Sequence, residues 1–183
     1  MKKQNFLLQR LFIALLYFSA FSFILSCEQG KAQPKVDIHT AVMTDNIGAL
    51  KQHIAAGDNI NQKEPGGGSS PLIIACLLGK TETAELLIHA GADINFRNND
   101  GSTPLITAAF FCRPDIVKLL LAKGADKTIK NNYGQTAYES VAGPFDPVKP
   151  AYDALGKMLA PIGLKLDYDY VRETRPKIAA MLK

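Results

Sequence analysis

Short apolar blocks, each followed by a glycine, recur along the chain. The blocks at residues 86–88 and 119–121 are apolar at three consecutive positions, and each lies just before a glycine, Gly91 or Gly124. Glycine supplies the left-handed conformation that ends many helices. A helix that is apolar on more than one side suits an element packed between two neighbours. We therefore expect short helices stacked against one another.

The pattern returns with a period of 33 residues. The tripeptide SPL at Ser70 aligns with TPL at Thr103 and with TAY at Thr136, and Gly91 and Gly124 keep the same offset. Self-similarity at a fixed period of this length is the signature of a repeat architecture. Proline suits the first turn of a helix, and the Ser or Thr before it can cap that turn.

These residues resemble the ankyrin repeat, whose pattern is Thr-Pro-Leu-His-x-Ala-Ala, two antiparallel helices and Gly-Ala-Asp-hydrophobic-Asn. The third copy matches best, with DGSTPLITAA from Asp100 and GAD from Gly124, whereas DIHTA from Asp37 opens a degenerate first copy. The resemblance implies an all-α solenoid of helix-turn-helix layers with short β-hairpin loops. Four repeats are expected, with a C-terminal capping helix, at about residues 36–65, 69–99, 102–132, 135–165 and 166–183.

The repeats depart from the pattern at three places. Gln52 and His53 replace two leucines of the third copy, so the outer side of the first copy can face water. The glycines at 66–68 predict a hairpin turn one residue longer than its counterpart in the third copy. Residues 143–147 (GPFDP) predict an insertion that separates the helices of the fourth copy, and Pro176 predicts a bend in the last helix.

The first 26 residues have the pattern of a secretion signal. Basic residues precede an apolar run at 11–25, which is shorter than the roughly 20 residues that span a membrane. The stretch ILSC ending at Cys27 resembles a bacterial lipobox, which implies cleavage before Cys27 and lipidation of its thiol. Residues 27–35 would then be a tether. Secretion without lipidation is the alternative. We expect an exported lipoprotein facing the periplasm or the cell surface.

Charge and cysteine content narrow the possible ligands. The formal charge of +4 includes three basic residues of the signal, so the remainder is almost neutral and no basic run indicates nucleic acid. Cys76 and Cys112 occupy different positions within their repeats, which favours two buried thiols over a disulfide. The three histidines also fall at three different repeat positions, so we expect no metal and no other cofactor.

Catalytic motifs are not recognisable in the sequence, and we expect a binding protein without a small-molecule substrate. The alternative is an enzyme that uses the C-terminal region, where carboxylates and tyrosines could serve acid–base chemistry. The residues concerned are Tyr152, Asp153, Asp167, Tyr168, Asp169, Tyr170 and Arg172.

The positions that vary within the ankyrin family and line its binding face carry over by register. They are Met43, Thr44, Lys63, Leu77, Leu78, Arg97, Asn99, Asp100, Ser102, Phe110, Phe111, Lys130, Asn132, Tyr133 and Gln135. Leu77–Leu78 and Phe110–Phe111 share two slots of adjacent repeats and could form an exposed apolar strip that anchors a partner. In that case Phe111→Asp abolishes binding and leaves helix content intact. The alternative is that the insertion, with Phe145 and Pro147, folds back over the strip.

A membrane-anchored module that docks a protein partner is thus the expected function. Exported ankyrin proteins of this size include some that resemble accessory factors for a periplasmic enzyme such as catalase. Others resemble immunity proteins that block a secreted toxin. Self-association without a separate partner is a further alternative.

Overall fold

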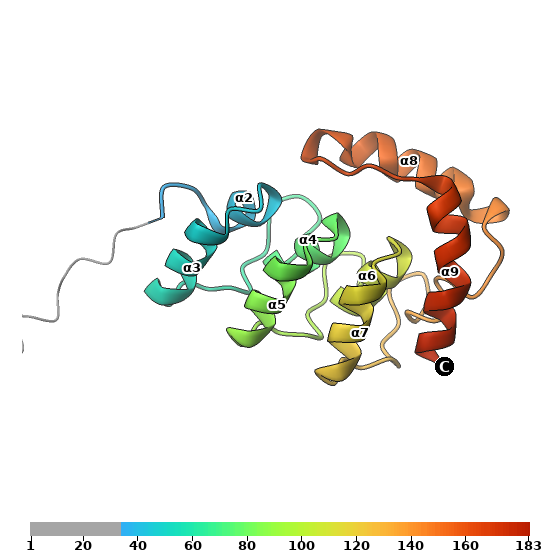
Figure 1. The fold of residues 1–183 in the computed structure, drawn as a ribbon, viewed down its shortest axis with the longest axis horizontal. Coiled ribbons are helices and arrows are strands. Elements are labelled where there is room, and N and C mark those ends of the chain that lie inside the picture. The colour runs from blue at the N-terminus through green and yellow to red at the C-terminus, as the bar shows by residue number, and fades with distance from the viewer. Residues whose placement is uncertain (1–33) are drawn as a thin grey trace, which may run out of the picture. The chain divides into compact units, whose positions relative to one another are not determined.

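Three pairs of short helices stand side by side in the part of the chain that the computed structural model describes, residues 34–183 (Figure 1). The pairs are α2 (Ile38–Met43) with α3 (Ile47–Ala56), α4 (Pro71–Leu78) with α5 (Thr81–His89), and α6 (Pro104–Phe110) with α7 (Pro114–Ala122). The first helices of successive pairs pack on one another, as do α5 and α7. This arrangement confirms the expected helical solenoid.

The core runs through the stack because each repeat supplies apolar side chains to both of its neighbours. Leu72, Leu87, Leu105 and Leu120 are fully buried. The expected start signals are also confirmed. The hydroxyl of Ser70 accepts from the N–H of Ile73, and Thr103 caps α6 in the same way, each followed by a proline in the first turn.

Glycines follow the second helix of each pair in the left-handed conformation. Gly57, Gly91 and Gly124 have φ values of 80°, 87° and 83°. A side chain in this region would be strained, so glycine at these positions lets the chain leave the helix and enter the next loop. The recurrence of glycine after each second helix thus reflects a backbone requirement.

The fourth copy departs from the regular pair. Residues 137–141 form turns instead of a first helix, although Ser140 N–H donates to the carbonyl of Thr136. The chain continues through η1 (Asp146–Val148), α8 (Lys149–Leu159), η2 (Ala160–Ile162) and α9 (Tyr168–Leu182). Helix α9 packs against α6 and α7 and closes the end of the stack (Figure 1). It continues through Pro176, where a bend was expected.

At the opposite end, the first repeat differs from the expectation in one residue. Gln52 is exposed, as expected of an outer side, but His53 is buried. The ring nitrogens of His53 lie 2.7 Å from Oδ2 of Asp58 and 2.8 Å from the carbonyl oxygen of Val36. The segment that precedes α2 therefore covers this histidine and shields it from water.

The proposed signal segment, Cys27 and most of the tether lie outside residues 34–183. Within that range, no helix is long and apolar enough to cross a membrane.

Candidate binding surface

The loops between successive pairs are narrow turns closed by backbone hydrogen bonds. Asn98 N–H donates to the carbonyl of Ser102 at 3.2 Å, and Asn131 N–H donates to Gln135 at 3.0 Å. In the second repeat the closing bond runs from Glu64 to Ser69 at 3.0 Å and so spans one residue more. The glycines at 66–68 therefore lengthen the turn, as the sequence predicts.

Hydrogen bonds join each loop tip to the next. Asn99 N–H donates to the carbonyl of Gly67 at 2.9 Å, and its side-chain amide donates to Gly66 at 3.3 Å. One repeat later, Asn132 makes the matching bonds to the carbonyls of Asp100 and Asn99, both at 2.9 Å. These bonds between neighbouring tips fix the loops relative to one another.

Three of the predicted binding residues are therefore engaged within the protein. Besides Asn99 and Asn132, the guanidinium of Arg97 donates to the carbonyl of Lys130 at 3.0 Å. All three remain exposed and can still meet a partner with their unused edges. Their hydrogen bonds, however, hold neighbouring loop tips together.

The other predicted tip residues present free side-chain surface. Asp100, Lys130, Tyr133 and Gln135 are exposed, and Ser102 is half-buried. Tyr133 is 74 % exposed. Its backbone N–H donates to the Asn131 side chain at 3.0 Å, so an ordered turn carries this ring into solvent. An exposed aromatic side chain on a rigid support is typical of a partner-binding position.

Leu77 and Leu78 lie half-buried at the end of α4. Leu78 packs against the core, and the carbonyl of Leu77 accepts two bonds from the Arg113 guanidinium, at 3.4 and 3.2 Å. Burial lowers the pKa of Arg113. Of the first two repeats' predicted residues, Met43 is also half-buried, whereas Thr44 and Lys63 are exposed.

Phe110 and Phe111 do not form an exposed strip, and that expectation is wrong. Phe111 is 7 % exposed, and the ring of Tyr152 from α8 stacks on Phe110 at a centroid distance of 4.5 Å and an angle of 9°. Phe145 of the insertion also packs on Tyr152, with ring centroids 5.6 Å apart. The insertion and α8 thus fold back over the pair, and we now expect Phe111→Asp to unfold this end.

A buried polar cluster ties this covering segment to the repeats. The hydroxyl of Tyr152 donates to the carbonyl of Phe110 at 2.6 Å and accepts from Nη1 of Arg175 in α9 at 2.9 Å. Tyr152 is fully buried, and burial raises its pKa to about 12. Burial also raises the pKa of the nearby Cys112 to about 11. Cys112 and Cys76 are both buried free thiols.

The residues of the possible catalytic site serve structural contacts. Asp167 caps α9 by accepting from the N–H groups of Asp169 and Tyr170. Arg172 bonds Asp169 at 3.0 Å and Asp146 at 3.3 Å. A hydrogen bond joins Asp153 to Tyr168 and lowers the pKa of Asp153. Asp153, Asp167, Asp169 and Arg172 are therefore engaged in hydrogen bonds and ion pairs within the C-terminal region.

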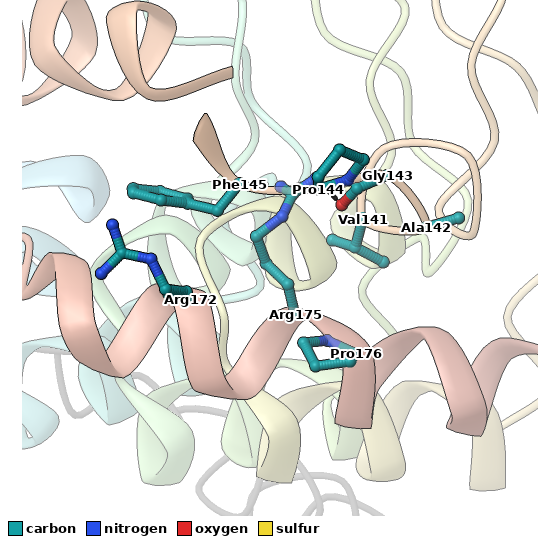
Figure 2. A pocket seen from close by; sticks show the side chains of 8 residues that line it. All are labelled: Val141, Ala142, Gly143, Pro144, Phe145, Arg172, Arg175 and Pro176. Carbon is teal, nitrogen blue, oxygen red and sulfur yellow. Dashed lines mark hydrogen bonds between the residues drawn. The ribbon is translucent and has the colours of Figure 1, made fainter. Parts of the chain in front are cut away.

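A pocket that the sequence did not indicate lies between α9 and the turn at residues 141–145 (Figure 2). Its volume is about 330 Å³, and the walls are mainly apolar apart from Arg172 and Arg175. Arg175 was missed because it follows no repeat register, and the only signal was a basic residue spaced with Val171 and Ile178 on the buried side of the last helix.

Comparison with known proteins agrees with this architecture. The family model for ankyrin repeats, in three copies, matches residues 38–131, about half of the chain. Among solved structures, the ankyrin repeat domain of Bcl-3, a member of the IkappaB protein family, is similar with a TM-score of 0.55 and 28% identity. The match covers 56% of this chain and 45% of the Bcl-3 chain, so this chain spans less than half of the length of the Bcl-3 chain. No curated protein matches the chain.

The residues matched are those that form the three regular helix pairs. Ankyrin repeat domains are in general protein-binding modules without enzymatic activity. The segment from Asn132 onward, which supplies Tyr152 and Arg175, lies beyond the matched residues. On the match over residues 38–131, the chain belongs to the ankyrin repeat family.

Proposed function

We propose that this protein binds a protein partner through the loop tips of its repeats, and that Tyr133 is a principal contact. The observation that carries the proposal is the 74 % exposure of Tyr133 on a turn that its own hydrogen bonds keep ordered. Aromatic side chains supply much of the energy of protein interfaces. A rigid tip loses little conformational freedom on binding.

Polar residues around Tyr133 supply the rim of such an interface. Nζ of Lys130 lies 3.5 Å from Oε1 of Glu139, which follows the same turn. Asp100 is exposed on the preceding tip. Charged residues at a rim act mainly on the association rate and on the choice of partner. The proposed interface therefore combines one aromatic anchor with charges of both signs.

Export and lipid anchoring form the second part of the proposal, and they rest on the sequence before residue 34. A basic start, an apolar run and the ILSC stretch support processing before Cys27 and lipidation of its thiol. Two or more acyl chains would hold the protein firmly on a membrane. The partner would then face the same periplasmic or surface compartment.

The anchor is tested by growing the native host with an alkyne-labelled fatty acid. The full chain should carry the label and sediment with membranes, whereas Cys27→Ser should lose both properties. An unlabelled wild-type chain in the culture medium would contradict the anchor and leave partner binding untouched.

Partner binding is tested by affinity capture from envelope extract with the full chain. Matched baits are Tyr133→Ser and Met158→Ser, because Met158 is also exposed, at 64 %, but belongs to α8 and not to a loop tip. One protein should be retained by the wild type and by Met158→Ser and lost with Tyr133→Ser. Equal retention by all three baits, or a self-associated chain as the only product, would contradict the tip interface.

The captured protein also separates the two candidate roles. An accessory factor for a periplasmic catalase should retain a haem protein, recognised by its Soret absorption band. An immunity protein should retain a toxin, whose hydrolytic activity falls when the wild-type chain is added in equimolar amount.

A further inference from the structure

Arg175 is a buried cation without a buried anion to balance it. Its side chain is 2 % exposed, and its two hydrogen bonds go to neutral oxygens, the hydroxyl of Tyr152 and the carbonyl of Gly143. Within residues 34–183 no carboxylate oxygen lies within 4.0 Å of its guanidinium. A buried charge is ordinarily paired, so its neutral surroundings point to a missing anion.

The two edges of the guanidinium differ in how well they are satisfied. Nη1 donates to the hydroxyl oxygen of Tyr152 at 2.9 Å. Nη2 donates to the carbonyl of Gly143 at the longer distance of 3.3 Å, and Nε has no hydrogen-bond partner. Nε and Nη2 share one edge of the planar group. That edge is the one that binds a carboxylate through two parallel hydrogen bonds.

The under-satisfied edge belongs to a side chain that lines the 330 Å³ pocket. In Figure 2 the side chain of Arg175 extends from α9 to the turn at Gly143 and Pro144. This turn is exposed and makes a single long bond to the edge, so an anion that replaced Gly143 would gain both donors. The volume lies at the lower end of the range of small-ligand pockets.

The charges and walls select the kind of anion. The other arginine of the pocket, Arg172, is already shared by Asp146 and Asp169. One positive charge therefore remains uncompensated, which matches a monoanion better than a doubly charged phosphate. The aromatic ring of Phe145 and two prolines suit an apolar body attached to the charged group.

From this geometry we infer that the pocket binds a carboxylate with an apolar body, and that the carboxylate accepts from Nε and Nη2 of Arg175. The ligand is either a free carboxylic acid or the C-terminal carboxylate of a polypeptide, because both present the same group. This site is separate from the loop tips, so it stands or falls independently of the proposed partner binding.

The test is calorimetric titration of the full chain in non-ionic detergent. The probes are phenylacetate and the peptide acetyl-Gly-Gly-Ala-Phe with a free carboxylate, each compared with its uncharged amide. The acids should bind at least about tenfold more tightly than the amides, since charge-assisted hydrogen bonds distinguish them. Phenylacetate binding as tightly as the peptide identifies a free acid as the source, and peptide binding alone identifies a polypeptide terminus.

Two variants locate the site. Arg175→Met removes the donors but keeps an unbranched apolar side chain, and it should weaken acid binding at least about tenfold. Gly143→Leu keeps Arg175 and adds a bulky side chain to the pocket wall, at a position where a Cβ meets no atom within 4 Å. It should also abolish binding, and it tests the site even if Arg175→Met fails to fold.

Three results with the unaltered chain would overturn the inference. They are no binding of either acid, equal binding of acid and amide, and displacement of the acid by inorganic phosphate at equal concentration. Unchanged acid binding by a folded Gly143→Leu variant would overturn it as well.

Discussion

Removal of a single hydroxyl group, in Tyr152→Phe, tests whether the C-terminal segment is held on the repeats by the buried polar cluster. The phenol bonds the carbonyl of Phe110 at 2.6 Å and receives a bond from Arg175 at 2.9 Å. Phenylalanine keeps the ring and its stacking on Phe110, so the change isolates the two hydrogen bonds.

The magnitude follows from what is left behind. The carbonyl of Phe110 and Nη1 of Arg175 both lose their partner in a site from which water is excluded, because Tyr152 is fully buried. An unsatisfied buried group costs about 1–3 kcal/mol, and more if it is charged. We expect the free energy of unfolding to fall by about 2–4 kcal/mol.

Urea unfolding followed by circular dichroism measures this change, since the chain has no tryptophan to serve as a fluorescence probe. Hydrogen exchange should show faster exchange of the α9 amides and little change in α4, because repeats contact only their neighbours. Tyr133→Phe is the matched control, because its phenol is exposed and should be worth less than about 0.5 kcal/mol.

A double-mutant cycle with Arg175→Met separates the two bonds. Without the guanidinium, the Tyr152 hydroxyl serves only Phe110, so the two changes should couple by about 1–2 kcal/mol. A loss below about 0.5 kcal/mol in Tyr152→Phe, or strictly additive effects, would refute the idea that this cluster holds the segment in place.

Three further changes test other parts of the structure. Gly79→Ala should lower the free energy of unfolding by at least about 1 kcal/mol, measured in urea, because φ is +73° and the new Cβ would lie 2.9 Å from the Arg113 guanidinium. Asn132→Ala should cost about 0.5–1.5 kcal/mol, read as a lower urea midpoint, because a bond between loop tips is lost. Since burial raises the pKa of Tyr152 to about 12 and of Cys112 to about 11, stability should persist to about pH 9. Stability should then fall by about 1.4 kcal/mol per pH unit for each group, between about pH 9 and 11 for Cys112 and between about pH 10 and 12 for Tyr152, so Cys112→Ala should delay the onset of the loss.

The regular repeats could be predicted from the sequence because each requirement recurs at a fixed offset. Each requirement involves residues that are close together in the sequence: a helix start at Thr103, an apolar block, and a left-handed residue at Gly124. Such local requirements are visible in the sequence itself. The fold class and three helix pairs follow from them. The prediction that His53 faces water was wrong because histidine occurs both at surfaces and in buried sites. Its burial here depends on the path of the segment before α2, which the repeat pattern does not specify.

The C-terminal segment could not be predicted in the same way. Tyr152 stacks on Phe110, and Phe145 and Arg175 both contact Tyr152, but these residues share no period with the repeats. Whether Phe110 and Phe111 are exposed or covered therefore depended on how residues 143–183 fold back. Composition indicated only that an aromatic cluster was available to cover it.

The two copies of each loop tip also show which tip residues serve the fold and which are free for a partner. Asn99 and Asn132 are the same residue one period apart, and both bond the preceding tip, so repetition accompanies a structural role. Asp100 and Tyr133 also lie one period apart, but they differ in chemistry and both project into solvent. A position that every repeat needs for cohesion keeps its residue, whereas a position that contacts a partner is shaped by the partner's surface, which differs from tip to tip. With Phe110 and Phe111 buried, this contrast favours Asp100 and Tyr133 as the residues that determine which protein binds.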